Sequence, residues 1–323
     1  MTVNSSTSAL SGSRRASWSS NPAWRLSFPR LVRSEWIKLF SLRSTVWLLA
    51  ITIGVALGLT AIVAGSMRML EGTINELTQG GDGSEGGQGG LSIGMGAAAG
   101  DLSSMAMPSL MELVTAAVPM MGVLVFSIVA VMMITNEYSS GMIRSTWVVA
   151  PRRKTVLTAK LLVLAVVTLL AFGLSLAGGF LLGRQILHGS ALIDLSFGSA
   201  TDWRIAGGFL IEMVATAALC LGLGMIVKST AGSIGACVAL LMVIPGIFST
   251  ISGFLPDPDS LPQWQRWLLD AGQFLPTTAG SQITVAQPAS DALLQPWAGL
   301  GVLGIWAVAA LAIGFIVSSR RDV

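Results

Sequence analysis

Six stretches of the chain are long, apolar and almost free of charge, and this feature restricts the fold more than any other. Each reaches or exceeds the roughly 20 residues that a helix needs to cross the hydrocarbon core of a bilayer, and only Glu212 places a charge inside one. We predict membrane-spanning helices over residues 45–67, 113–134, 161–183, 205–227, 229–255 and 297–319. Strands of a transmembrane barrel alternate apolar and polar residues. Continuous runs such as AVVTLLAFGLSLAGGFLL therefore predict an all-α integral membrane protein with six transmembrane helices.

Composition agrees with a membrane protein. Charged residues make up 11% of the chain and hydrophobic residues 53%, whereas soluble domains carry about 25% charged residues.

The cysteines and the single histidine do not indicate a metal or catalytic site. Cys220 and Cys237 fall in predicted spans and are interpreted as small packing residues. His188 lies in a loop with no Cys or second His beside it, so no metal site is expected. No His lies within a span to pair with a Ser or Cys, so no intramembrane catalytic centre is expected either.

Basic residues gather on one side of the predicted spans. Most of the 19 Lys and Arg residues lie before the first span, in the loop after the second, or at the C-terminus. Because Lys and Arg accumulate in short cytoplasmic loops, we predict that both termini are cytoplasmic. Residues 1–27, which lack the apolar core of a signal peptide, are expected to form a disordered cytoplasmic tail. Residues 68–110, with a glycine-rich tract, and residues 256–296 are then extracellular loops.

Residues 28–43, FPRLVRSEWIKLFSLR, are predicted to form an interfacial helix before the first span. Apolar residues recur at helical spacing on one broad side, and basic residues occupy much of the remainder. The residues of interest are Arg33, Glu35, Trp36 and Lys38. Two interpretations remain open: a positively charged anchor, or an anchor that also offers a docking surface to a cytoplasmic partner.

The loop TNEYSSGMIRSTWVVAPRRKTVLTAK, residues 135–160, contains more than topology requires. A basic cluster alone would satisfy the cytoplasmic preference, but it does not explain Glu137, Tyr138 and Gly141 directly after a span. MIRSTWVV followed by Pro151 predicts a short helix along the membrane surface, with the proline opening the third span. A rigid surface helix of this kind would move both adjoining spans together.

The pattern N-E-Y-S-S-G-x-I-R-x-T-x-x-x-x-P-R-R in this loop resembles ABC-transporter permeases of the ABC-2 type. Three further segments are similar to that family: R-S-E-W-I-K-L at residues 33–39, L-G-L-G-M-I-V-K-S-T-A-G at 221–232 and F-L-P-T-T-A-G at 274–280. The resemblance implies a six-span permease domain over residues 28–323. Met142 departs from the pattern, because a small polar residue is more usual there.

By this resemblance the loop is a coupling helix that sits in a cleft of a separate cytoplasmic ABC ATPase. The residues that match the family motif are Glu137, Tyr138, Ser139, Gly141, Arg144, Arg152 and Arg153. The implied assembly has two ATPase subunits, which bind ATP and Mg²⁺, and two permease chains, identical or related, in the plasma membrane of a bacterium. The resemblance further implies that the permease contacts membrane lipid but no nucleic acid, holds no cofactor and catalyses nothing. Its expected activity is the export of amphipathic drugs, peptides or lipids.

Glu212, in FLIEMVATAALC, is the one acid within a predicted span. An ionisable residue at that depth is costly and usually functional or directed into the bundle. It lies only about seven residues past the predicted start of its helix, so a side chain that reaches the outer interface is an equal alternative. The second candidate function is an ion- or proton-coupled secondary transporter or channel that uses Glu212, although no inverted pair of broken helices is evident.

Three further expectations concern the outer half and the helix contacts. Residues 261–275 place apolar side chains at helical intervals and predict an amphipathic helix in the outer leaflet, either a cap over the exit or a simple lid. Small residues at positions 222, 224, 232, 235 and 236 predict close packing between the fourth and fifth spans. Pro245 is predicted to kink the fifth span.

Overall fold

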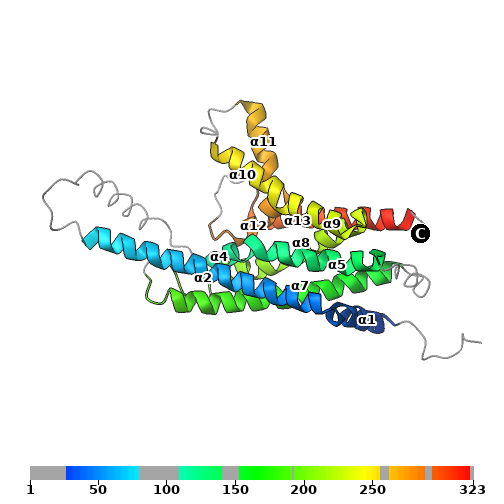
Figure 1. The fold of residues 1–323 in the computed structure, drawn as a ribbon. Helices are drawn as coiled ribbons and strands as arrows, with labels where there is room; N and C mark the ends of the chain where they lie inside the picture. The colour runs from blue at the N-terminus through cyan, green and yellow to red at the C-terminus, as the bar shows by residue number, and fades with distance from the viewer. Residues whose placement is uncertain are drawn as a thin grey trace, which may run out of the picture.

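The computed structural model describes residues 27–79, 109–139, 153–190, 193–254, 262–287 and 293–320 (Figure 1). The helices are α1 (Phe28–Ser41), α2 (Arg43–Gln79), α4 (Leu110–Ala117), α5 (Pro119–Ser139), α7 (Arg153–Ile186), α8 (Ala200–Val227), α9 (Thr230–Val238), the π-helix η3 (Ala239–Val243), α10 (Ile244–Phe254), α11 (Gln263–Gln273), α12 (Pro276–Ser281), the 3₁₀-helix η5 (Gln282–Thr284) and α13 (Pro296–Arg320). Within the described ranges the only extended pairing is an isolated bridge between Ser109 and Asp194. Five helices are long and apolar enough to cross a membrane, or six if the bent pair α4–α5 counts as one span. The all-α class is confirmed.

The first span is longer than predicted. α2 continues to Gln79, so residues 68–79, which were assigned to the glycine-rich loop, are helical. Arg68 pairs with Glu71 one turn later, at 3.2 Å, and no proline interrupts the segment. The prediction ended the helix where hydropathy fell, but a helix can continue beyond the bilayer as long as its residues tolerate helical geometry. Residues 80–108 lie outside the described part of the chain.

The second predicted span is not one continuous helix. α4 and the main part of α5 are bent by 53° relative to each other. Pro119 begins α5 directly after Val118, and it lacks the N–H that would continue the hydrogen-bond ladder of α4. Hydropathy alone could not show this bend, because both segments are apolar.

The fifth span contains a π-helical turn immediately before Pro245. Ile244 donates its N–H to the carbonyl of Ala239, five residues back, and residues 230–252 still qualify as one span. The predicted proline distortion therefore takes the form of a π turn, which accommodates the missing proline N–H.

Helix α8 lies at the centre of the bundle and packs against α5, α7 and α13. Phe209 of α8 meets Phe172 of α7 edge-on, with ring centroids 6.0 Å apart. Gly222 lies against the backbone of α13 at Ala310, and Gly224 lies against Ile134 of α5. The prediction that these two glycines join the fourth and fifth spans was wrong, because their open face points to α13 and α5. A glycine pattern marks a close contact but does not name the partner helix.

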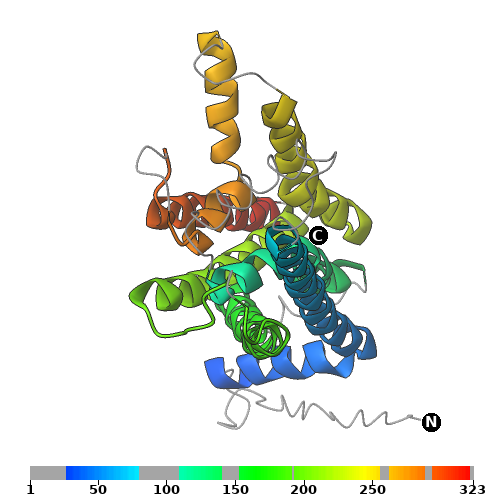
Figure 2. The same cartoon turned by 90° about the vertical axis from the view of Figure 1, so that its left-hand side faces the viewer.

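Helix α1 lies across one end of the bundle. In Figure 2, α1 runs across the view while α7 is seen nearly end-on, and Leu42 separates α1 from α2. Glu35 and Leu39, one turn apart, are buried on the inward face, whereas Trp36 and Phe40 are exposed and their rings lie 4.8 Å apart. This crosswise position is the geometry expected of an interfacial helix.

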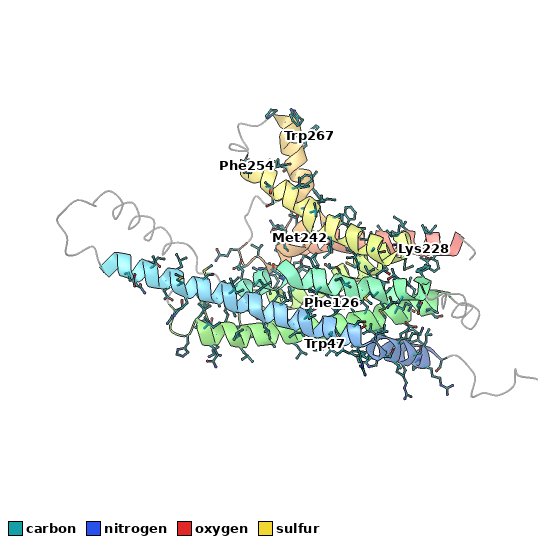
Figure 3. The ribbon with its side chains drawn as sticks, in the orientation of Figure 1. Trp47, Phe126, Lys228, Met242, Phe254 and Trp267 are labelled. Carbon is teal, nitrogen blue, oxygen red and sulfur yellow. The ribbon has the colours of Figure 1, made fainter. Side chains whose placement is uncertain are left out.

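Helices α10 and α11 project together from the bundle (Figures 1 and 3). The predicted amphipathic segment is helical from Gln263 to Gln273, and Gly272 lies against the ring of Phe248 in α10. Trp264 and Trp267 are 62% and 67% exposed. The described residues leave most of each ring uncovered, so the rings are available to lipid or to another chain.

Candidate functional site

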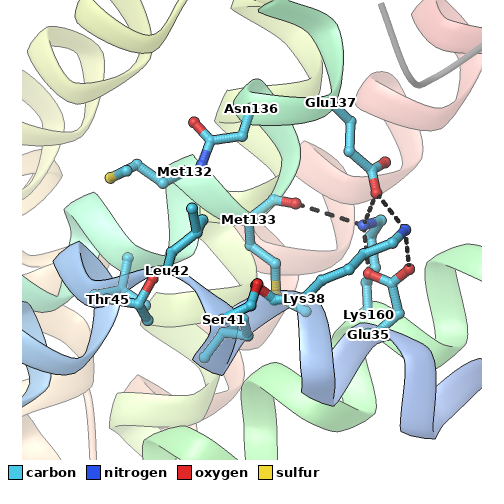
Figure 4. A pocket seen from close by; sticks show the side chains of 12 residues that line it. Glu35, Lys38, Ser41, Leu42, Thr45, Met132, Met133, Asn136, Glu137 and Lys160 are labelled. Atoms are coloured by element: carbon cyan, nitrogen blue, oxygen red, sulfur yellow. Dashed lines mark hydrogen bonds and ion pairs between the residues drawn. The ribbon is translucent and has the colours of Figure 1, made fainter. Parts of the chain in front are cut away.

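A buried charge cluster joins three helices at the end of the bundle where α1 lies (Figure 4). The Lys160 Nζ atom of α7 donates to Glu35 Oε2 of α1 at 2.6 Å and to Glu137 Oε1 of α5 at 2.7 Å. It also lies 3.5 Å from the carbonyl oxygen of Met133. The Lys160 side chain is only 3% exposed, so its charge is balanced within the protein and not by water.

Lys38 completes the cluster from its more open side. Its Nζ donates to Glu35 Oε1 at 2.9 Å and to Glu137 Oε1 at 3.1 Å, and its side chain is 38% exposed. Two carboxylates and two ammonium groups thus share five hydrogen bonds, including that to Met133, and carry no net charge. We call Glu35, Lys38, Glu137 and Lys160 the charge cluster.

The neighbouring charges shift the pKa values of Glu35 and Lys38, the two charge-cluster residues on α1. Burial by itself would raise the pKa of Glu35, but Lys160 and Lys38 more than offset it and hold that pKa below the usual value. Burial would lower the pKa of Lys38, whereas hydrogen bonding to Glu35 and the charge of Glu137 raise it above the usual value. Both groups are therefore held in their charged forms.

A cavity of about 560 Å³ adjoins the charge cluster. Leu42, Val129, Met132 and Met133 give it a largely apolar lining beside the charges. Thr45, at the start of α2, and Asn136, one residue before Glu137, add polar atoms. The charge cluster thus forms one wall of a space between α1, the start of α2 and the end of α5.

Some of the predicted coupling residues lie in the described part of the chain, and others lie outside it. Tyr138 forms a 2.9 Å hydrogen bond between its hydroxyl and Ser318 of α13, and the Lys228 ammonium lies 5.6 Å from the centre of its ring. Ser139 and Arg153 end α5 and begin α7, but their side chains are not described. Gly141, Arg144, Arg152 and the predicted coupling helix itself lie outside the described residues. Arg33 is exposed on α1.

Sequence reasoning missed Lys160 as the centre of the charge cluster. Lys160 was counted only among the cytoplasmic charges, one residue before the predicted third span. α7 in fact begins at Arg153, so Lys160 lies two turns inside the helix. Lys160 lies six residues beyond the basic cluster at residues 151–154 and directly before the apolar run. A charge in that position needs a buried partner, and this was the signal available in the sequence.

Glu212 of α8 forms a second site, which is lined in part by the start of α5, whereas the charge cluster lies at the end of α5. α8 begins at Ala200 with a capping box made by Ser199 and Asp202, five residues earlier than predicted, so Glu212 lies near the middle of this 28-residue helix. It is 5% exposed and lines a cavity of about 600 Å³. The structure therefore places the Glu212 side chain inside the bundle.

A bundle of five to six apolar spans with charged groups enclosed between them defines a polytopic α-helical membrane protein. Residues 104–316 match the family model described as ABC-2 family transporter protein, and the chain belongs to that family. Proteins of this family are generally non-enzymatic membrane subunits that work with an ATPase partner. A comparison with curated proteins found no match. The matched residues include Glu137, Lys160 and Glu212 but not α1, so the charge cluster joins the family region to a helix before it.

Proposed function

We propose that this chain is the permease subunit of an ATP-driven exporter and that residues 140–152 dock on a separate cytoplasmic ATPase. The observation that carries the proposal is the charge cluster. Glu137 lies directly before the docking segment, and Lys160 lies shortly after it on the next helix. One ion pair of 2.7 Å thus joins the last turn of α5 to the first turns of α7, the two helices that a coupling element would push.

The charge cluster extends this linkage to α1. Lys160 and Lys38 both bridge Glu35 to Glu137, so displacement of the docking segment would shift α1, α5 and α7 as one body. Rigid-body movement of packed helices is a common way to carry a domain closure into a membrane. Since Glu137 is directed inward, its proposed part is to position the docking segment. Direct contact with the ATPase would come from Ser139, Gly141, Arg144, Arg152 and Arg153.

The complete exporter in this proposal contains two permease chains, identical or related, and two ATPase subunits that bind ATP and Mg²⁺. Both termini of the permease face the cytoplasm of a bacterial cell, and substrate leaves through the plasma membrane. Support for the orientation comes from the cytoplasmic bias of Lys and Arg and from the crosswise position of α1 at the end that carries most of these charges.

Affinity purification of the tagged chain in mild detergent tests the coupling. We expect an ATPase to copurify and expect Arg144→Ala to lose it. Arg184→Ala, at the other end of α7, is the matched control and should retain the ATPase. Glu137→Gln should retain part of the ATPase but uncouple ATP hydrolysis from transport. A pure single chain without ATPase activity under all conditions would contradict the proposal.

A second candidate function is favoured by Glu212 alone. A buried acid with an unpartnered oxygen could couple substrate movement to a proton, as in secondary transporters. In vesicles that contain the permease without any ATPase, this candidate predicts uptake driven by a proton gradient and abolished by Glu212→Gln. No gradient-driven uptake in wild-type vesicles would exclude it.

A further inference from the structure

The cavity around Glu212 has the form of a small-molecule site. It lies between the start of α5, the middle of α8, the η3–α10 region and the α12–η5 segment. Its volume of about 600 Å³ is within the roughly 300–1,000 Å³ range of ligand pockets. Apolar side chains such as Val123, Leu241 and Met242 form much of its wall, and the polar groups converge near α12.

Two buried oxygen atoms in this cavity have no hydrogen-bond partner among the described residues: Glu212 Oε2 and Thr277 Oγ1. An unsatisfied buried polar group is costly, and a buried carboxylate more so. Three other hydroxyls of the cavity are already used within the local backbone, since Thr115, Ser281 and Thr284 donate to nearby carbonyl oxygens. The two unsatisfied atoms are therefore available to a ligand.

The cavity is lined by acidic side chains, and no basic side chain of the described lining faces them. Glu112 and Glu212 both line it, and none of the described lining residues is Lys, Arg or His. The basic residue near the start of α8, Arg204, donates to the carbonyl oxygens of Val285 and Ala286 at 2.8 and 3.0 Å. In a medium of low dielectric constant, uncompensated carboxylates strongly favour a cationic partner.

The segment that follows η5 at the edge of the cavity is held by two side chains. Glu112 accepts a hydrogen bond from the N–H of Ala286 at 3.0 Å, and Arg204 donates to the carbonyl oxygen of the same residue. Gly280 of α12 lies so close to Glu212 that a Cβ there would come within 3.1 Å of both Cγ and Oε1. A glycine at this position leaves the room that the carboxyl group occupies.

We propose that this cavity binds an organic cation, an ammonium or amidinium group on an apolar body, and that Glu212 is its charge partner. Thr277 supplies a second polar contact, and the apolar wall takes the body of the ligand. This inference rests on the proposed function and names the substrate class that the permease would carry. An ammonium-bearing lipid headgroup has the same chemistry and is the other possible source.

Ethidium binding to the full chain in nanodiscs tests the proposal, with no ATPase present. Ethidium is a permanent, fluorescent organic cation, and the anion 1-anilinonaphthalene-8-sulfonate is the control probe. We expect Glu212→Gln to weaken ethidium binding about tenfold or more and Thr277→Val to weaken it less, with the anion unaffected. Glu71→Gln, an acid on α2 paired with Arg68, is the matched control and should bind ethidium like wild type.

Two results would overturn the proposal: wild-type protein that fails to bind ethidium, or equal ethidium affinity in wild type and both cavity variants. Should Glu212→Gln fail to fold, Thr277→Val and the comparison of cation with anion in wild type still test the proposal.

A second experiment distinguishes a lipid headgroup from a soluble cation as the natural ligand. It compares ethidium binding in nanodiscs of anionic lipid alone with binding in nanodiscs that contain phosphatidylethanolamine. Ethidium displaced by the ammonium lipid indicates a lipid ligand, and unchanged affinity indicates a solute. Since the assay omits the ATPase, its failure leaves the docking proposal intact, and loss of docking leaves this site intact.

Discussion

Lys160 and Glu35 are separated by 125 positions in the chain, yet their side chains form a 2.6 Å hydrogen-bonded ion pair in the interior. Their exposed fractions are only 3% and 2%. The pair fixes α1 to the core of the bundle, so a specific contact between buried side chains holds this helix in place. A lone charge at either position would be buried without compensation.

Replacing Lys160 should therefore be the most damaging change in the charge cluster. Lys160→Met leaves Glu35 and Glu137 to share only the partly exposed Lys38, and we expect the free energy of unfolding to fall by about 3–5 kcal/mol. Lys38→Met should cost about 1 kcal/mol or less, because water partly replaces a solvent-accessible pair. Thermal unfolding of the purified proteins in one detergent measures both. Equal losses for the two variants would contradict a buried centre at Lys160.

The charge cluster should also make stability depend on pH. The pKa of Glu35 is lowered in the folded protein relative to its usual value of 4.5, so the unfolded chain binds this proton more readily than the folded chain does. The contribution of ionised Glu35 is then complete above pH 4.5 and is lost as the pH falls below 4.5 toward the lowered folded value. Comparing the unfolding temperature of wild type with Glu35→Gln shows this: their difference should be largest near pH 7 and shrink in acid.

The glycine at the crossing of α8 and α13 should not tolerate a side chain. A Cβ on Gly222 would lie 2.7 Å from the backbone carbon of Ala310, so Gly222→Ala requires the helices to separate and should cost about 1–3 kcal/mol. Gly235→Ala on α9 meets nothing within 4 Å and should be neutral or stabilising by about 0.5–1 kcal/mol. Unfolding measurements on both variants test the assignment. A neutral Gly222→Ala would mean that this crossing is looser than described.

Gly280 offers a test of the Glu212 cavity that leaves the carboxyl group in place. Gly280→Ala would press on Glu212 and on Leu303 of α13, and we expect ethidium to bind several-fold more weakly while the chain stays folded. Gly301→Ala on α13, which meets nothing within 4 Å, is the control. If both variants bind ethidium like wild type, the probe does not contact Glu212 in the way proposed.

Much of the fold could be predicted from hydropathy and charge, but the helix boundaries could not. Apolar runs located the spans, yet α2 continues twelve residues beyond the predicted Met67, to Gln79, because helix propensity and not hydropathy decides where a helix ends. The bend at Pro119 was missed because α4 and α5 are both apolar. At the candidate sites, the sequence singled out Glu137 and Glu212 but could not say which way either side chain points.

The sequence by itself determined the class of protein, its helical spans and the ABC-2 family, since apolar length and local motifs are properties of consecutive residues. Only the tertiary structure decided that Glu35, Lys38, Glu137 and Lys160 form one cluster and that Glu212 faces a cavity whose described lining includes no basic residue. These facts depend on the rotation of each helix about its axis and on which helices become neighbours. Packing across the whole bundle sets both, and no single segment contains that information.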